Sequence, residues 1–459
     1  MRRMLQDAAT AIGAPLHGAD RGFVSVSTDS RTLEPGALFV ALRGPNFDGA
    51  GFVAAAAQAG AAGAIVPRLM PVELPQIPVS DTLAALQALG AAWRRQFTMP
   101  LVAVAGSNGK TTVKEMTASI LAQMGPGLAT QGNLNNHIGV PLTLLRMTAA
   151  HASAVIELGA NRIGEVAQLM ALVKPTVALI TNAGAEHLEG FGDLEGVARG
   201  EGEAIGCLDE AGTAIINADD AFAGYWRGLA VRRRVLCFGM NRSADVTARE
   251  VTQLIKHGEF VTHFMLSTPA GEAQALIHAG GAHNVLNALA AAAAASAAGA
   301  SLAHVTAGLG RFRPVGGRLQ LKAGARGGWI IDDSYNANPS SVRAGLDVLR
   351  TLPPPTWLVL GEMAELGDKS AESHADIGAY ARSCGVQRMF CVGAPTAQAA
   401  AGFGESAEWF PGVEPLIARL KSEWPAAVTV LIKGSRINRL ERVVTALTNG
   451  DISSTAGVH

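Results

Sequence analysis

One seven-residue stretch, GSNGKTT at positions 106–112, constrains the fold of this chain more than any other feature. It follows an apolar run at residues 101–105 and precedes a helical pattern that begins near Val113. A strand, a glycine turn and a helix start in this order are typical of a P-loop, whose backbone N–H groups and lysine surround phosphates. Because Val104 stands where the usual P-loop has its first glycine, a chance glycine turn that carries a lysine is the alternative.

All seven residues of this loop are expected to bind ATP: Gly106, Ser107, Asn108, Gly109, Lys110, Thr111 and Thr112. The hydroxyl of Thr111 is also placed to bind Mg²⁺, and the ammonium of Lys110 to stabilise charge on a transferring phosphoryl group.

Composition narrows the class of protein. The 459 residues suffice for two to four domains, and a net charge of −1 does not favour nucleic acid or an acidic membrane surface as a partner. The four cysteines form no Cys-x-x-Cys pair, which is typical of the reducing cytosol. The N-terminal residues contain no apolar run like that of a signal peptide, so we expect a cytoplasmic protein. The alanine-rich residues 288–300 are predicted to form a buried helix rather than a membrane span.

Two breaks in the sequence divide the chain into three expected domains, which span residues 1–82, 83–314 and 315–459. A proline-dense segment from Pro67 reads as an inter-domain edge, and Pro314 with its glycine neighbours marks the second break. Between and after them, apolar runs alternate with helical patterns, which is typical of parallel α/β sheets. These runs occupy residues 101–105, 154–157, 177–181, 214–217, 329–332, 357–360, 388–392 and 428–433. We predict an α/β protein of three domains whose polar tail from Asn449 frays.

Five further stretches follow the same order as motifs of a known family. They are TQGNLNNHIGVP at 130–141, ELGAN at 157–161, TNAGAEHLEGFG at 181–192, GAHNVLNA at 281–288 and DDSYNANPS at 332–340. With the P-loop they resemble the Mur ligases, the ATP-dependent amide-bond formers of peptidoglycan synthesis. The resemblance covers residues 25–445. It implies a small N-terminal α/β domain that binds UDP, a central parallel-sheet P-loop ATPase domain and a C-terminal Rossmann-like α/β domain.

The resemblance implies four catalytic residues: Lys110, Glu157, His187 and Arg318. In the family, the residues that match Glu157 and His187 help to hold Mg²⁺. Carboxylate oxygens suit Mg²⁺, but imidazole is an uncommon ligand for it. The role of His187 as a Mg²⁺ ligand is therefore predicted from the resemblance alone. A purely structural strand-end glutamate is the alternative for Glu157.

Glu201 departs from the family pattern. In the stretch ARGEGE at 198–203 it occupies the position of a lysine that, in sibling enzymes, is understood to carry a carbamate at the second metal. We hypothesise that Glu201 supplies a permanent carboxylate to Mg²⁺, directly or through water. A solvated surface glutamate is the alternative.

The resemblance also implies the remaining ATP contacts. Asn284 and Asn287 would face the adenine, with helix capping as the alternative for Asn284. Asp333 would take the ribose hydroxyls, and Tyr335 and Asn336 would line the nucleotide. A strand-end turn without function is the alternative for this stretch, in which the next helix is expected to begin at the serines 340 and 341.

Basic residues near the domain boundaries complete the expected phosphate site. The planar guanidinium of Arg318 suits a phosphate reached across a domain gap, with a plain surface arginine as the alternative. Lys433 and Arg436 stand at a strand end as a pair that could face a carboxylate or a phosphate, with a solvated basic turn as the alternative.

Recognition of the UDP-linked substrate is expected at two places. Asparagines of the 130–141 stretch would line the substrate cleft: Asn133, Asn135 and Asn136. A polar turn of the first domain looks like the family's UDP-recognition site: Ser27, Asp29, Ser30 and Arg31. A hydroxyl, backbone N–H groups and an arginine suit a diphosphate. Without the resemblance, these residues would predict only a polar turn.

The stretch at 332–340 is similar to that of the family member that joins D-alanyl-D-alanine to UDP-N-acetylmuramoyl-tripeptide. It implies that ATP phosphorylates the tripeptide carboxylate and that the dipeptide amine then displaces phosphate. We expect these two substrates as partners, no nucleic acid, no membrane span and a monomer. A folylpolyglutamate synthetase, which shares the P-loop, is the alternative ligase. A non-catalytic nucleotide-dependent switch is the alternative outside enzymes.

Overall fold

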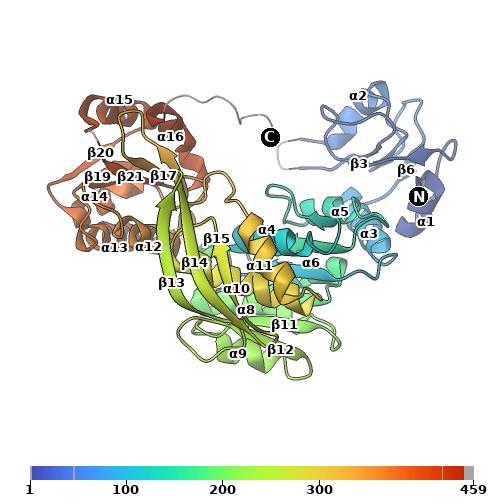
Figure 1. Ribbon diagram of the computed structural model, residues 1–459. Helices are drawn as coiled ribbons and strands as arrows, with labels where there is room; N and C mark the ends of the chain where they lie inside the picture. Colours follow the sequence, from blue (N-terminus) through green and yellow to red (C-terminus); the bar gives the residue numbers. More distant parts are fainter. Residues whose placement is uncertain (1–2, 45–46, 426, 449–459) are drawn as a thin grey trace.

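The structure is a computed structural model that describes residues 3–44, 47–425 and 427–448. Figure 1 shows three α/β units, with the first and the last on opposite sides of the central one. The expected fraying of the tail from Asn449 concerns residues outside the described range. Within that range, no helix combines the length and the apolar character needed to cross a bilayer.

The N-terminal unit is built on a parallel four-stranded sheet in the order β3-β4-β5-β6. Its elements are β1 (Arg3–Met4), α1 (Leu5–Ile12), β2 (Gly22–Phe23), β3 (Val26–Ser27), β4 (Leu38–Val40), η1 (Gly49–Phe52), α2 (Val53–Gln58), β5 (Gly63–Val66) and β6 (Gln76–Pro78). Leu38, Ile65 and Ile77 project from the sheet into a core that also buries Leu5 of α1. The sheet therefore has its own apolar core.

The proline-dense segment belongs to this unit and does not form an inter-domain edge. β6 lies within it and pairs with β5, and Pro78 ends this outermost strand, where a proline is tolerated. The next helix, α3 (Thr82–Arg94), packs against α1 and also against α5 (Gly139–Leu144) of the central unit. The prediction of an edge from Pro67 is wrong because the segment contributes a strand to the sheet.

The central unit carries a six-stranded parallel sheet in the order β12-β11-β10-β7-β9-β8. Its strands are β7 (Leu101–Ala105), β8 (Gly127–Ala129), β9 (Ser153–Glu157), β10 (Val177–Ile180), β11 (Thr213–Asn217) and β12 (Arg234–Phe238). Its other helices are α4 (Lys110–Leu121), α6 (Glu165–Val173), α7 (Leu188–Phe191), α8 (Leu194–Gly206), α9 (Ala223–Leu229), α10 (Ala282–Ala297) and α11 (Leu302–Arg311). Every residue of β7 and β9 is buried, as expected for strands covered on both faces.

The alanine-rich stretch forms α10, as predicted. Each residue from Ala288 to Ala295 is at most 1 % exposed. Small side chains let this helix approach α4, the helix that follows the P-loop, and both helices contribute to one core beneath the sheet.

An antiparallel sheet in the central unit was not predicted. It consists of β13 (Thr247–Lys256), β14 (Glu259–Thr268) and β15 (Gly271–Ile277). Phe264 and Leu266 of β14 are buried in the α10 core, whereas β13 is an exposed and largely polar edge strand with a weak apolar signal. The hairpin of β13 and β14 extends to the C-terminal unit, where Phe260 packs with Ile331 (Figure 1).

The C-terminal unit has a six-stranded sheet in the order β16-β17-β21-β18-β19-β20, parallel except for β16. Its strands are β16 (Gln320–Ala323), β17 (Trp329–Asp333), β18 (Thr356–Gly361), β19 (Arg388–Val392), β20 (Ala407–Phe410) and β21 (Thr429–Lys433). Its helices are α12 (Pro339–Leu349), η2 (Gly367–Lys369), α13 (Ser370–Ser383), η3 (Ala394–Thr396), α14 (Ala397–Phe403), α15 (Val413–Glu423), η4 (Arg436–Asn438) and α16 (Glu441–Leu447). All eight predicted apolar runs fall on strands of these two sheets.

Candidate active site

The P-loop lies between β7 and α4, as the motif predicts. Its glycines have a left-handed backbone, with φ of 112° at Gly106 and 82° at Gly109. A Cβ at Gly106 would stand 2.2 Å from Thr181 Oγ1, and one at Gly109 would stand 2.4 Å from Asn287 Oδ1. Only glycine fits at either position. The helix begins at Lys110, earlier than predicted, so its first N–H groups belong to the loop itself.

Lys110 is held by the loop and by one carboxylate. Its ammonium donates to the carbonyl oxygens of Gly106 and Ser107, the latter at 3.0 Å, and lies 3.2 Å from Glu186 Oε1. Burial acts to lower the pKa of Lys110, but the charges of Glu186 and Glu201 outweigh it and the pKa is raised. Lys110 is therefore a fixed positive charge at neutral pH.

Glu201 lies beneath the P-loop, so the surface alternative is wrong. Its side chain is 1 % exposed, and its Oε2 accepts the N–H of Gly106 at 2.6 Å. Burial raises the pKa of this carboxyl to about 7, although the charge of Lys110 opposes the rise. Because the carboxylate faces the loop backbone, its role toward Mg²⁺ stays a prediction.

Glu157 ends β9 with one carboxylate oxygen free. Asn135 Nδ2 donates to Oε1 at 2.8 Å, whereas Oε2 is buried and bonds with no residue in the described part of the chain. A buried carboxylate oxygen is unfavourable unless a donor or a cation satisfies it. The free oxygen fits a hard cation better than it fits a purely structural glutamate.

His187 lies at the start of α7 with a left-handed backbone, φ 49°. Its Nδ1 contacts Oε2 of Glu365, which belongs to the C-terminal unit. His187 and Glu157 line the same cavity. No three His, Cys, Asp or Glu side chains among the described residues form a complete metal site. A Mg²⁺ ion would therefore depend on phosphate oxygens as well, which is its usual mode in nucleotide sites.

Arg318 reaches from the C-terminal unit back to the P-loop. Its Nη2 donates to Thr111 Oγ1 at 2.9 Å, and its guanidinium carbon lies 4.3 Å from the centroid of the Tyr335 ring. Its Nε is buried without a partner within the described ranges. A spare buried donor beside the P-loop suits a phosphate and disfavours the alternative of a plain surface arginine.

Asp333 and Lys433 form the opposite wall. They pair at 2.7 Å, and Lys433 also donates to the carbonyl oxygen of Asn336 at 2.9 Å. Arg436 does not join Lys433 as predicted, because its exposed side chain lies 3.5 Å from Glu441 instead. The ribose contact of Asp333 stays a prediction.

Amide side chains join the P-loop directly to α12. Asn338 Nδ2 donates to Asn108 Oδ1 at 2.8 Å, and Asn108 Nδ2 donates to Ser340 Oγ at 3.0 Å. Asn338 also caps α12, since its Oδ1 accepts the N–H of Ser341 at 2.9 Å. The helix thus begins at Pro339, before the predicted serines, and asparagine directly before proline was the signal.

Glu186 is the residue that sequence analysis missed. Besides its contact with Lys110, its Oε2 lies 3.5 Å from Asn338 Nδ2 across the gap between the units. Its position beside His187, in the loop after β10, was the available signal.

Most of these side chains line one cavity of about 630 Å³ between the central and C-terminal units. Most of the predicted residues line it: Ser107, Asn108, Gly109, Lys110, Thr111, Thr112, Asn133, Asn135, Asn136, Glu157, His187, Asn284, Asn287, Arg318, Asp333, Tyr335 and Asn336. Gly106 and Glu201 lie behind the wall of the P-loop, and the four residues of the N-terminal turn do not reach the cavity.

The predicted adenine end has a fixed pair of amides. Asn287 Nδ2 donates to Asn284 Oδ1 at 3.1 Å, and Asn284 Nδ2 donates to the carbonyl oxygen of Gly280 at 2.8 Å. The N-cap of α10 is Gly281, so the capping alternative for Asn284 is wrong.

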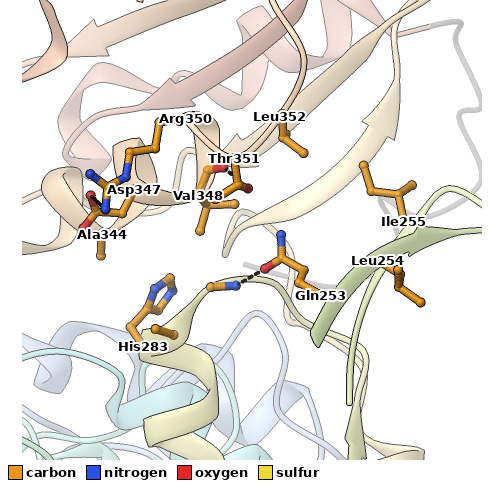
Figure 2. A pocket seen from close by; sticks show the side chains of 12 residues that line it. Gln253, Leu254, Ile255, His283, Ala344, Asp347, Val348, Arg350, Thr351 and Leu352 are labelled. Carbon is orange, nitrogen blue, oxygen red and sulfur yellow. Dashed lines mark hydrogen bonds and ion pairs between the residues drawn. The ribbon is translucent and has the colours of Figure 1, made fainter. Parts of the chain in front are cut away.

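His283 and Ala344 line both this cavity and a second one of about 620 Å³, which Figure 2 shows. Figure 2 shows apolar side chains on both of its sides, with Leu254 and Ile255 on β13 and Val348 near the end of α12. Burial lowers the pKa of His283, so its imidazole is neutral at pH 7.

The N-terminal turn is closed on itself. Arg31 pairs with Asp29 through two side-chain bonds of 2.9 and 2.7 Å, and Ser27 Oγ donates to the carbonyl oxygen of Asp29 at 3.0 Å. The Arg31 guanidinium holds the pKa of Asp29 below its usual value. The turn leaves Arg31 exposed, and its contact with UDP stays a prediction.

Comparison with known proteins assigns the family. Three models match consecutive parts of the chain: "Mur ligase family, catalytic domain" at residues 23–94, "Mur ligase middle domain" at 104–295 and "Mur ligase, glutamate ligase domain" at 317–436. The UDP-N-acetylmuramoyl-tripeptide–D-alanyl-D-alanine ligase of Escherichia coli (strain K12) is 43% identical over 441 residues, which cover 95% of this chain and 96% of that protein. The chain belongs to the Mur ligase family.

A solved structure agrees with the architecture of this Mur ligase. The crystal structure of MurF from Acinetobacter baumannii superimposes with a TM-score of 0.90 at 35% identity, covering 97% of this chain and 98% of that one. The α/β fold of three domains is thereby confirmed.

The folylpolyglutamate synthetases, the alternative class of ligase, are only distantly similar to this Mur ligase. A folylpolyglutamate synthase structure from Mycobacterium tuberculosis has a TM-score of 0.63 at 17% identity and covers 80% of this chain. That likeness extends to the fold alone.

Proposed function

We propose that this Mur ligase joins D-alanyl-D-alanine to the C-terminal carboxylate of UDP-N-acetylmuramoyl-tripeptide, with ATP as phosphoryl donor, in the synthesis of peptidoglycan precursors. One observation carries the proposal: a single cavity collects a P-loop lysine, a buried carboxylate with a free oxygen and the side chains of the 332–340 stretch. The E. coli relative that bears this activity in its name matches the chain over almost its full length.

The first step is transfer of a phosphoryl group. A carboxylate oxygen of the tripeptide attacks the γ-phosphorus of ATP, the bond to the β-γ bridging oxygen breaks, and ADP leaves. Lys110 and the free Nε–H of Arg318 neutralise charge on the transferring group.

The second step forms the amide. The dipeptide amine attacks the carbonyl carbon of the acyl phosphate, inorganic phosphate leaves, and the ammonium proton is released. The Glu186 carboxylate, whose Oε2 lies 3.5 Å from Asn338 Nδ2, is a negative group beside the C-terminal unit that suits an incoming ammonium.

Mg²⁺ would be held by Thr111, Glu157 and His187 together with phosphate oxygens. It would supply charge neutralisation of the triphosphate. Glu157 is the strongest of these candidates, because its buried Oε2 has no partner within the described residues.

The proposal gives each unit one task. Residues 1–82 bind the UDP end through Ser27, Asp29, Ser30 and Arg31, residues 83–314 bind ATP, and residues 315–459 complete the nucleotide site and receive the dipeptide. Because both substrates are water-soluble under this proposal, the enzyme acts in the cytoplasm, and we take it to be a monomer.

The test measures phosphate release in the presence of ATP, UDP-N-acetylmuramoyl-tripeptide and D-alanyl-D-alanine, with each component omitted in turn. Release is expected only in the complete mixture, together with a nucleotide product heavier by the dipeptide less water. Release that does not depend on the dipeptide contradicts the proposal. Release with a reduced folate and glutamate favours the folylpolyglutamate alternative.

A further inference from the structure

The pair of His187 and Glu365 is one of several side-chain contacts between the central and C-terminal units. His187 follows β10 in the central unit, and Glu365 follows β18 in the C-terminal unit. The histidine Nδ1 and the carboxylate Oε2 are in direct contact. Glu365 belongs to the stretch GEMAELG at 361–367, for which the proposed reaction has no use so far.

Both residues adopt backbone conformations that a side chain disfavours. The φ angle is 49° at His187 and 62° at Glu365, in the left-handed region. Such conformations persist where the surroundings impose them, and they gather at functional sites. The two loops also approach each other nearby, since a Cβ on Gly367 would lie 3.7 Å from Glu189 Cγ.

The bonding of the imidazole determines which nitrogen can take a cation. With Nδ1–H donated to Glu365, the lone pair is on Nε2. A carboxylate bonded to the second ring nitrogen is the usual companion of a metal-binding histidine, since it fixes the tautomer and the ring orientation. His187 lines the cavity with Glu157, whose buried Oε2 bonds with no described residue.

We propose that Glu365 orients His187 toward a divalent cation, so that the cation site is completed only when the C-terminal unit meets the central unit. Glu365 is a positioning residue, because it acts through the imidazole and does not touch the cation. The inference rests on the proposed function in one respect: it takes His187 as a cation ligand.

The alternative is a surface ion pair that merely holds the units together. The side chains of His187 and Glu365 are 27% and 54% exposed, and exposed pairs contribute little to stability. The two readings differ in how the protein binds the ATP analogue without a cation. If Glu365 acts through the imidazole, Glu365→Ala weakens Mn²⁺ binding and leaves binding of the analogue in the absence of Mn²⁺ unchanged. If the pair only holds the units together, Glu365→Ala weakens binding of the analogue with or without Mn²⁺, because the cavity lies between the two units.

The experiment measures Mn²⁺ binding by electron paramagnetic resonance, using the full-length protein saturated with a non-hydrolysable ATP analogue. We expect Glu365→Ala to weaken Mn²⁺ binding by about 10-fold, which is the usual lower bound for loss of such a partner. Glu365→Gln is expected to weaken it less, because the amide oxygen still accepts the Nδ1–H bond. Asp368→Ala, an exposed acid of the same loop, is the matched control and should bind Mn²⁺ like the parent.

The outcomes separate this inference from the function on which it rests. Weaker Mn²⁺ binding in Glu365→Ala, with parent-like binding of the analogue in the absence of Mn²⁺, supports the inference. Parent-like binding in Glu365→Ala, beside weakened binding in His187→Ala, overturns the role of Glu365 and keeps the cation site. Parent-like binding in His187→Ala overturns the proposed cation site itself. Melting curves of every variant show whether a loss of binding reflects a loss of folding.

Discussion

Two regions of this Mur ligase were expected to bind phosphates from short polar motifs, yet they are built differently. The P-loop lysine is 15% exposed and is held by backbone oxygens and a carboxylate from another loop. The N-terminal arginine Arg31 is 86% exposed, and among the described residues it bonds only within its own turn. The first site is fixed before a ligand arrives, whereas the second has to exchange an internal ion pair for its ligand.

This difference has a physical consequence. Fixed charges in a partly buried site act strongly on a ligand, because water does not compete and no side chain has to be ordered. An exposed arginine that already pairs with a carboxylate has to give up that pair to bind a phosphate. Its net contribution to the binding free energy is therefore only the difference between two similar contacts. Substitutions at the P-loop should therefore impair the chemical step, and substitutions at the turn should impair substrate binding alone.

The largest effect is expected for Lys110→Met, which keeps the length of the side chain and removes its charge. We expect kcat to fall by roughly 10³-fold, since a preorganised positive charge on the transferring group is lost. Steady-state phosphate release measures it, with Lys256→Met on exposed β13 as the control. A rise in KM for ATP with an unchanged kcat would mean that Lys110 binds ATP without assisting the transfer.

Arg318→Lys should give the next largest effect. Lysine keeps the charge but has neither the planar fork that lies over Tyr335 nor the reach of two separate donors. A decrease in kcat/KM for ATP of about 10²-fold is expected, measured at saturating concentrations of both other substrates. Tyr335→Phe keeps the stacked ring and serves as the control. Equal activity of Arg318→Lys and the parent would show that the guanidinium has no contact with phosphate.

At the N-terminal turn, Arg31→Ala should raise KM for the UDP-linked substrate by a few-fold and leave kcat unchanged, because the exposed guanidinium exchanges its pair with Asp29 for the ligand. The exposed Arg21 of the same unit provides the control, as Arg21→Ala. A change in kcat comparable to that of Lys110→Met would erase the distinction between the two regions.

The same contrast explains what the sequence could reveal. The P-loop, the buried strands and α10 depend on residues close together in the chain, so local pattern and composition predict them. The strands at 101–105 and 388–392 were predicted to the residue. The exposed strand β13 carries almost no apolar periodicity, and its sheet was therefore missed.

Contacts between distant residues were beyond a sequence-based prediction. The Asn108–Asn338 and Lys110–Glu186 pairs depend on how two units meet, and nothing in either local stretch specifies that arrangement. For the same reason, two roles for Glu201, a metal ligand and a surface residue, stayed open from the sequence. A buried side chain that supports the P-loop was not predicted. Its burial is a property of packing and became visible only with α8 placed against β7.

Glu201 supplies a further prediction, which concerns stability rather than activity and compares the two regions by the pH dependence of unfolding. Its pKa is raised from 4.5 to about 7. Between these values the folded protein keeps the proton and the unfolded chain releases it, so Glu201 lowers stability progressively as pH rises, by about 3 kcal/mol at most. Asp29 has the opposite shift, because Arg31 lowers its pKa. Asp29 therefore adds stability at neutral pH, which is lost as pH falls and is weakened by solvent screening.

Glu201→Gln retains an oxygen for the Gly106 N–H and removes the ionisation, so its melting temperature relative to the parent should be higher at pH 8 than at pH 5. A rise of a few degrees is expected at pH 8, since 1 kcal/mol corresponds to about 2–4 °C in a domain of this size. Asp29→Asn should lower the melting temperature slightly and almost equally at both pH values, because Asp29, whose pKa lies below its usual value of 3.8, is ionised at pH 5 and at pH 8. Thermal unfolding of the three full-length proteins at both pH values measures this. If Glu201→Gln and the parent differ equally at pH 5 and pH 8, the buried carboxyl does not titrate with folding, and the P-loop is held by geometry without a contribution from this charge.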